Sequence, residues 1–157
     1  MEINFLNPNK RTKYLDLEII AAPIVHRVFT VGYVLIEKDT IGKLDMDKVK
    51  ELGVPKGPLL GKLKSKIDIT LEDGKVIKWK DVIGDDIKGR KIVILGDTCD
   101  PSEISKIAKD CDVISHESTL ENDEEESCIQ KGHSTPKMAA TFAKSIGAKR
   151  LILTHYR

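Results

Sequence analysis

Two apolar segments in the first quarter of the chain, residues 15–23 and 30–37, have the hydrophobic pattern of β-strands. They read LDLEIIAAP and TVGYVLIE, in which β-branched and other apolar residues alternate with polar residues or follow one another directly. His26 lies between these segments, on a turn that begins at Pro23. The pattern therefore predicts two strands with a histidine on the turn between them.

The middle of the chain predicts shorter elements and one basic segment. Residues 44–52 favour a helix that begins at Asp45 and stops at Gly53. The segment IDITLEDGKVIKW predicts a β-hairpin that turns at the Asp-Gly pair 73–74. Between them, PKGPLLGKLKSK combines proline and glycine with lysines and contains no acidic residue. Its lysines are Lys56, Lys62, Lys64 and Lys66.

The last third of the chain alternates short apolar runs with helical patterns. The runs KIVIL (91–95), DVIS (112–115) and LILT (151–154) are typical of strands buried in an α/β sheet. Helices are expected at 102–109, 122–131 and 136–146. The order β-α-β-α-α-β predicts an α/β fold built from packed layers.

The composition is that of a folded, soluble domain. Its 157 residues suffice for one domain with a core, and 40% of them are hydrophobic. The net charge of +1 argues against a strongly basic nucleic-acid-binding surface, but it is compatible with a local basic arm. Cys99, Cys111 and Cys128 follow no CxxC spacing, which favours free thiols in a reducing compartment. No apolar run approaches the length of a membrane span, so we expect no membrane contact.

Acidic and histidine side chains follow the predicted strands of the last third, at the point where each strand ends. Asp97 follows KIVILG, His116 and Glu117 follow DVIS, and His155 follows LILT. Each of these residues alone is more often an ordinary turn or surface residue. Neighbouring strands lie about 4.8 Å apart, however, so strand ends that meet at one edge bring such side chains together. Because zinc binds histidine nitrogen and carboxylate oxygen, the pattern predicts a metal site, to which His26 would add a ligand.

His133 lies in the segment GHST, directly before a predicted helix. A helix N-terminus attracts anions such as a phosphate, although the Gly-His pair could instead serve only to shape a loop. Glu117 could hydrogen-bond an imidazole and raise its proton affinity. The sequence therefore predicts a Glu117–His133 pair that acts as a general acid toward an oxyanion leaving group.

In this order, the motifs resemble those of the ribonuclease Z family, the tRNA 3′-processing endonucleases of the metallo-β-lactamase superfamily, and most closely its short form. The resemblance runs from about Leu17 to His155. It is carried by PIVHRVFTVGYVLIEKD, GPLLGKLK, ITLEDGKVI, GRKIVILGDT, DVISHESTLE, GHSTPKMAATFAK and AKRLILTH. HEST and GHST match the HEAT and HST motifs of the family, with Ser118 in place of alanine.

The resemblance implies a role for each matching residue of the site. His26 and His155 would each bind one of two zinc ions, and Asp97 would bridge both. Glu117 and His133 would protonate the 3′-oxygen leaving group. The sequence departs from the family in one large respect, because the His-x-His-x-Asp-His motif that supplies further zinc ligands is absent from the chain.

Residues 38–82 match the position of the flexible arm with which the family grips tRNA. The matching substrate-binding residues are Gly57, Pro58, Lys62 and Lys64. The lysines admit a simpler interpretation as a solvated face, but in a protruding arm they would contact phosphates without reading base sequence. The arm also argues against another hydrolase of the superfamily. His116 matches the family's HEAT histidine, to which we assign no ligand role.

The implied fold is a metallo-β-lactamase-like αβ/βα sandwich, of which residues 1–157 form an incomplete, C-terminal half with the arm inserted. We therefore expect the C-terminal part of a zinc-dependent endoribonuclease that removes 3′ trailers from tRNA precursors and that has little or no activity alone. The alternative is a truncated paralogue that binds tRNA or dimerises without catalysis. The resemblance further implies a homodimer and a location in the cytoplasm, with the nucleus as a second site.

Overall fold

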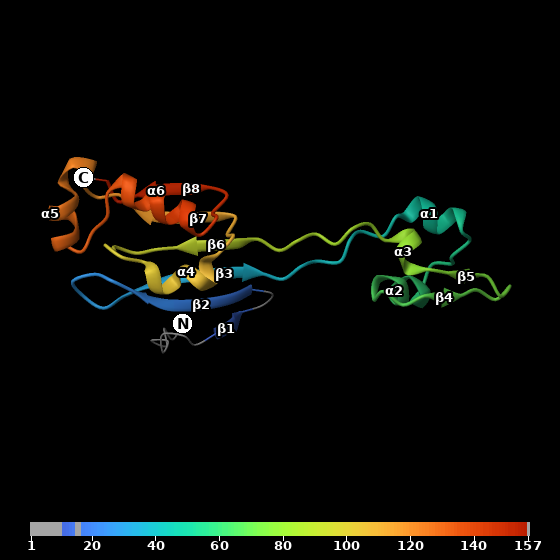
Figure 1. The fold of residues 1–157 in the computed structure, drawn as a ribbon. Helices are drawn as coiled ribbons and strands as arrows, with labels where there is room; N and C mark the ends of the chain where they lie inside the picture. The colour runs from blue at the N-terminus through green and yellow to red at the C-terminus, as the bar shows by residue number, and fades with distance from the viewer. Residues whose placement is uncertain (1–10, 15–16, 157) are drawn as a thin grey trace. The chain divides into compact units, whose positions relative to one another are not determined.

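The computed structural model describes residues 11–14 and 17–156, which form two compact units (Figure 1). The sheet unit contains the chain up to Lys38 and again from Gly89 onward, and the insert unit contains residues 39–88. The chain thus leaves the sheet unit once and returns to it. No helix in the described ranges is long and apolar enough to cross a membrane.

The sheet unit contains a six-stranded sheet in the order β1-β2-β3-β6-β7-β8. Its strands are β1 (Arg11–Tyr14), β2 (Leu17–Ile24), β3 (Thr30–Glu37), β6 (Lys91–Ile94), β7 (Val113–Glu117) and β8 (Leu151–Thr154). The strands from β1 to β6 pair in antiparallel fashion, and β6, β7 and β8 pair in parallel. Because β2 and β6 are both antiparallel to β3, the carboxyl ends of β2, β6, β7 and β8 all lie at one edge.

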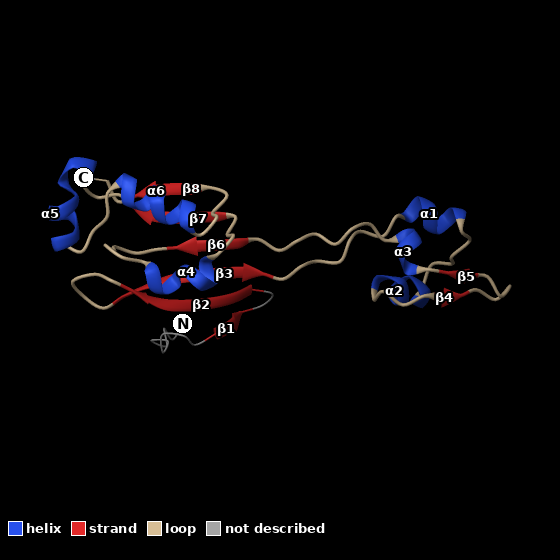
Figure 2. Ribbon diagram, viewed as in Figure 1, coloured by secondary structure: helices blue, strands red, loops and turns tan. Residues whose placement is uncertain are grey.

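Helices cover one face of this sheet (Figure 2). The 3-10 turn η1 (Ser102–Ile104) and the helices α4 (Ser105–Ala108) and α6 (Pro136–Ser145) pack on this face, whereas the 3-10 turn η2 (Asn122–Glu124) leads into the helix α5 (Glu125–Gln130), which lies beyond the ends of the strands. Val34, Val93 and Ile114, one from each central strand, are fully buried and pack with Ile104 and Ala143 of the helical layer. Burial of these apolar side chains holds the helices on the sheet.

The opposite face of the sheet carries partly exposed apolar side chains. Tyr33, Ile94, Ser115 and Ile152 are register neighbours across β3, β6, β7 and β8. Successive side chains alternate between the two faces of a sheet, so this row points away from the helices. Tyr33, Ile94 and Ile152 are between 39% and 52% exposed, which is typical of a surface that packs against another structural layer.

The insert unit has a small core of its own. It contains α1 (Met46–Glu51), α2 (Pro58–Lys64), β4 (Ile69–Thr70), β5 (Val76–Ile77) and α3 (Trp79–Val82). Val49, Leu63, Ile69, Ile77 and Val82 are buried together in this core. As predicted, the Asp45 carboxylate caps α1 and accepts hydrogen bonds from the backbone N–H groups of residues 47 and 48.

The insert unit overlaps the predicted arm, residues 38–82, and extends beyond it to Lys88. Two isolated bridges pair Thr40 with Ile87 and Leu44 with Ile83. The outgoing and returning segments therefore run side by side, which adds the residues after 82 to the unit. Its tRNA-binding role stays a prediction.

The predicted α/β fold class is confirmed, while several helical segments differ from the prediction: the helix expected at 122–131 begins as the 3-10 turn η2, and helix α3, which begins at Trp79, was not predicted. The basic segment contains helix α2, because Pro58 suits a first helical turn and Leu63 is buried in the insert core. The helix expected at 102–109 begins instead as the 3-10 turn η1, which follows Pro101 directly. Of the strand expected at 15–23, residues 15 and 16 lie outside the described ranges.

Candidate metal centre

The side chains predicted to bind metal converge where the four like-directed strands end. His26 lies just after β2, Asp97 lies just after β6, Glu117 is the last residue of β7 and His155 directly follows β8. His133 joins them from the loop before α6. The sheet topology thus confirms that the strands of the last third are neighbours, which was the condition for these residues to meet.

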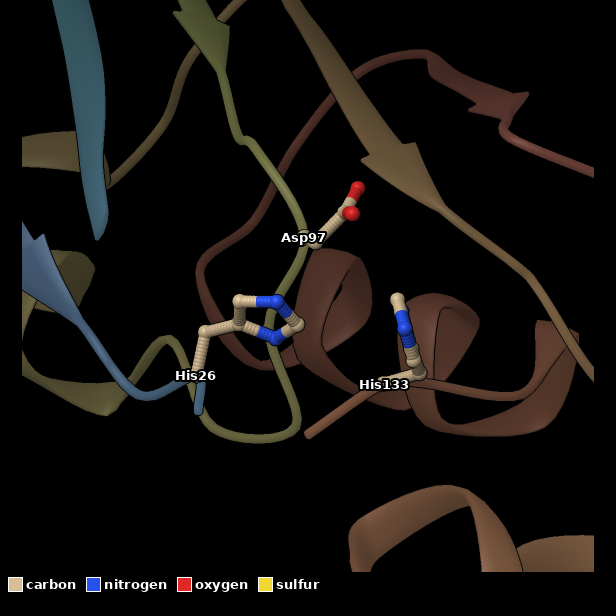
Figure 3. Close-up of side chains that lie close together, drawn as sticks. All are labelled: His26, Asp97 and His133. Atoms are coloured by element: carbon tan, nitrogen blue, oxygen red, sulfur yellow. The ribbon is translucent and has the colours of Figure 1, made fainter. Parts of the chain in front are cut away.

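Two overlapping groups of side chains are close enough to hold metal ions. His26, Asp97 and His133 each offer a ligand atom, and the three atoms lie within 4.8 Å of one another (Figure 3). Glu117, His133 and His155 form a second group by the same measure. His133 belongs to both groups, and its ring centroid lies 5.0 Å from that of His26 and 5.6 Å from that of His155.

Each of the three imidazoles is anchored through Nδ1. His26 Nδ1 donates to the carbonyl oxygen of Gly132 at 2.7 Å, and His133 Nδ1 donates to Glu117 Oε1 at 2.9 Å. His155 Nδ1 lies 2.8 Å from the hydroxyl oxygen of Thr119. A neutral imidazole that donates through Nδ1 leaves Nε2 as a bare ligand atom. In their neutral forms, His26 and His133 therefore keep Nε2 as a ligand atom without a hydrogen.

Gly132 is the residue that allows the chain to approach His26 so closely. Its φ of 78° lies in the left-handed region, and a Cβ at this position would lie 2.7 Å from His26 Nδ1. Any other residue would meet both backbone strain and a clash with the imidazole. Gly132, the glycine of the GHST segment, thus leaves room for the imidazole of His26, which is far away in the sequence.

Glu117 is the buried centre of the hydrogen-bond network, with 1% of its surface exposed. Its carboxylate accepts hydrogen bonds from the backbone N–H of Thr98 at 2.8 Å, from the hydroxyl of Thr119 and from His133. Burial raises the pKa of this carboxyl, but the hydrogen bonds from Thr119, Thr98, Ser134 and His133 outweigh it and hold the pKa below its ordinary value. Glu117 is therefore a carboxylate at neutral pH.

A family comparison agrees with this arrangement of strands and ligands. Residues 67–156 match the family described as "Beta-lactamase superfamily domain". The chain belongs to the beta-lactamase superfamily. Imidazole nitrogens and carboxylate oxygens that meet within 4.8 Å suit a divalent metal, so the donor set fits the metal cofactor that this membership implies.

Within the superfamily, the chain is similar to ribonuclease Z, which confirms the resemblance predicted from the motifs. It is 44% identical to ribonuclease Z of Myxococcus xanthus over 135 residues, which are 86% of this chain and 44% of that protein. It is 46% identical to zinc phosphodiesterase ELAC protein 1 of Bos taurus over 136 residues, 85% of this chain and 37% of that protein. The crystal structure of human tRNase Z, short form, matches with a TM-score of 0.58 at 28% identity, over 92% of this chain and 38% of that chain. The chain therefore spans less than half the length of these relatives.

Two residues close to Glu117 in the sequence also bear on this site of the superfamily domain, although the sequence pattern assigned a role to neither. His116 does not join the ligand groups, because it points to the helical side, where it is 1% exposed and lies edge-on to Phe142. Its Nδ1 donates to the backbone carbonyl of Glu117 at 2.8 Å, and burial lowers its pKa. Thr119 was missed entirely, and its hydroxyl contacts both Glu117 and His155.

The residues predicted to bind substrate lie in the insert unit, on and beside α2. Gly57 precedes the helix with a φ of 138°, a conformation that only glycine adopts readily, and Pro58 begins it. Lys62 and Lys64 are exposed on the helix. They belong to a different unit from the metal ligands, as expected for an inserted arm of a superfamily domain.

Proposed function

We propose that this chain is part of a zinc-dependent endoribonuclease that removes 3′ trailers from tRNA precursors. Two observations support this function: the similarity to ribonuclease Z over most of the chain, and the convergence of His26, Asp97 and His155 beside the Glu117–His133 pair. The convergence carries the proposal, because imidazole and carboxylate groups that meet at one sheet edge suit metal binding and proton transfer.

In this site, His26 and His155 would each hold one zinc ion, and the Asp97 carboxylate would be shared between the two ions. Asp97 lies between them, within ligand distance of the His26 group and with Oδ1 3.4 Å from His155 Nδ1. When bound, zinc supplies Lewis-acid stabilisation of the scissile phosphate and activation of water. The residues of the chain itself orient the imidazole rings of His26 and His155 and supply the Asp97 carboxylate as a ligand.

We assign the proton on the leaving oxygen to His133. The buried Glu117 carboxylate accepts the hydrogen of His133 Nδ1 at 2.9 Å and fixes the orientation of the ring. In the proposed step, His133 Nε2 delivers a proton to the 3′-oxygen that leaves from the tRNA. Because a protonated Nε2 cannot bind metal, His133 serves as the acid and not as a ligand in this assignment, despite its place in both ligand groups.

The substrate is held by the insert unit. Lys62 and Lys64 are exposed side chains on α2, and the segment from residue 52 to 67 contains no acidic residue that could neutralise them. Lysines in such a setting bind RNA phosphates and make the affinity fall with salt. We also propose a homodimer, in which the insert unit of one subunit serves the site of the other.

A chimera tests the catalytic proposal. In it, the chain replaces the matching 135 residues of Myxococcus xanthus ribonuclease Z, and that enzyme supplies the rest of the length. We expect the chimera to bind zinc and to cleave the trailer of a tRNA precursor, and the 157-residue chain alone to bind zinc weakly and to cleave little or nothing.

Two variants of the chimera separate the roles. Asp97→Asn should reduce both zinc content and cleavage, whereas His133→Ala should reduce cleavage and leave the zinc content unchanged. Loss of zinc in the His133 variant would show that this residue is a ligand. Efficient cleavage by the 157-residue chain alone, with two zinc ions bound, would contradict the requirement for a second part.

A second candidate function is a non-catalytic tRNA-binding module. It is favoured by the separate core of the insert unit, which lets its basic helix exist without the metal centre. In this case the 157-residue chain should bind tRNA equally well with and without a chelator, and the chimera should stay inactive despite correct folding.

A further inference from the structure

We propose that Thr119 is a positioning residue of the metal centre, whose hydroxyl oxygen accepts the Nδ1 hydrogen of His155 and so keeps this imidazole from bonding to Asp97. The inference rests on the proposed metal-dependent function of the same site.

The hydrogen-bond donors around Thr119 determine the tautomer of His155. A threonine hydroxyl has one hydrogen, and the Glu117 carboxylate, which has none, accepts it at Oε2. The hydroxyl oxygen is then left as an acceptor for His155 Nδ1, 2.8 Å away. His155 must therefore carry its hydrogen on Nδ1, which leaves Nε2 bare.

Asp97 is the competing acceptor for the same hydrogen. Its Oδ1 lies 3.4 Å from His155 Nδ1, farther than the Thr119 oxygen. Without the hydroxyl, Asp97 is the remaining close acceptor, and a shorter contact with His155 would turn the proposed bridging carboxylate away from the metal. Thr119 thus protects two ligands with one group.

His155 depends on this hydrogen bond because packing does not hold it. Its side chain is 50% exposed, whereas that of His133 is 13% exposed. Its backbone adopts a φ of 56°, which turns the chain directly after β8. Thr119, by contrast, is secured by its backbone N–H, which donates to Ser134 O at 2.9 Å and to Glu117 Oε2 at 3.2 Å. A side-chain substitution at Thr119 therefore leaves its own anchoring in place.

The test compares Thr119→Val, which keeps the shape and removes the hydroxyl, with Thr119→Ser, which keeps the hydroxyl. Thr141→Val is the matched control, because the Thr141 hydroxyl bonds only within α6, to Lys137 O. Zinc affinity of the chimera with Myxococcus xanthus ribonuclease Z, carrying each substitution, is measured by competition with a chelating dye. We expect Thr119→Val to weaken zinc binding by roughly 10- to 100-fold, as for other residues that orient metal ligands, and Thr119→Ser to restore most of the affinity.

Histidine side-chain nitrogen NMR of the metal-free chain supplies a second readout. In the unsubstituted chain, His155 should carry its hydrogen on Nδ1 and donate it to Thr119, and in Thr119→Val the chemical shifts of this nitrogen and its hydrogen should change because the hydrogen is donated to Asp97 instead. Unchanged zinc affinity and unchanged His155 side-chain shifts in Thr119→Val would overturn the inference. If the unsubstituted chimera binds no zinc, the proposed function fails, while the NMR comparison still decides whether Thr119 holds the Nδ1 hydrogen of His155.

Discussion

The two units of the chain present their polar side chains in opposite ways. In the sheet unit, Glu117 is buried and bonded to several donors, and every histidine of the site is anchored through Nδ1. In the insert unit, Lys62 and Lys64 project from a short helix over a separate apolar core. Metal ligands must be held to within about 0.5 Å, whereas a phosphate contact needs mainly charge. Substitutions should therefore affect the two units independently.

The strongest effect should come from the insert core. Leu63 is fully buried there, so Leu63→Ala should destabilise the insert unit by roughly 2–5 kcal/mol through reduced burial and a cavity. Hydrogen exchange followed by mass spectrometry should show reduced protection within residues 39–88 and unchanged protection in β6, β7 and β8. Lys64→Ala, at the next position on the same helix, is the exposed control. Reduced protection in both units would show that their stabilities are coupled.

The corresponding change in the sheet unit is Glu117→Gln. The amide group replaces one acceptor oxygen with a donor, which then faces the N–H of Thr98 or of Thr119. A buried donor without an acceptor costs about 1–3 kcal/mol, so β7 should lose hydrogen-exchange protection while the insert unit keeps its own. Glu126→Gln, at an exposed position on α5, should change nothing. Equal hydrogen-exchange protection of β7 in the two variants would show that the Glu117 hydrogen bonds do not stabilise the sheet unit.

The sequence predicted the strand-end ligands because apolar runs mark buried strands, and the residues after them share an edge once the strands are neighbours. It could not reveal that Thr119 and Asp97 both approach Nδ1 of His155, because these contacts depend on separate loops that meet at the sheet edge. Helix α2 escaped prediction for a related reason. Its short, glycine-containing segment has weak helical preference, and the burial of Leu63 in a local core decides its conformation.

The charge of the insert unit can be tested without disturbing either core. Substitution of Lys62 and Lys64 by alanine should weaken tRNA binding and lower the slope of affinity against salt by roughly 2, about 1 for each lysine that no longer neutralises a phosphate. Lys48 and Lys50 of α1 supply the matched control pair, since they lie within 4.0 Å of Asp45 and Asp47. Filter binding across a salt series measures both pairs. If alanine substitution of Lys48 and Lys50 lowered the salt slope equally, the net charge of the insert unit, and not the position of the lysines on α2, would determine binding.

The weakest effect concerns the ion pair where the chain leaves and re-enters the sheet unit. Glu37 ends β3, and the Arg90 guanidinium beside it lowers the pKa of the Glu37 carboxyl to about 2. Because the folded pKa lies below the ordinary value of 4.5, the pair stabilises the folded chain fully above about pH 4.5 and loses this effect as the pH falls toward 2. Glu37→Gln should therefore lower the melting temperature slightly at neutral pH and match the unsubstituted chain near pH 2, since the pair is exposed and screened by solvent. A melting-temperature difference that stays constant from pH 7 to pH 2 would mean that Glu37 acts through packing and not through its charge.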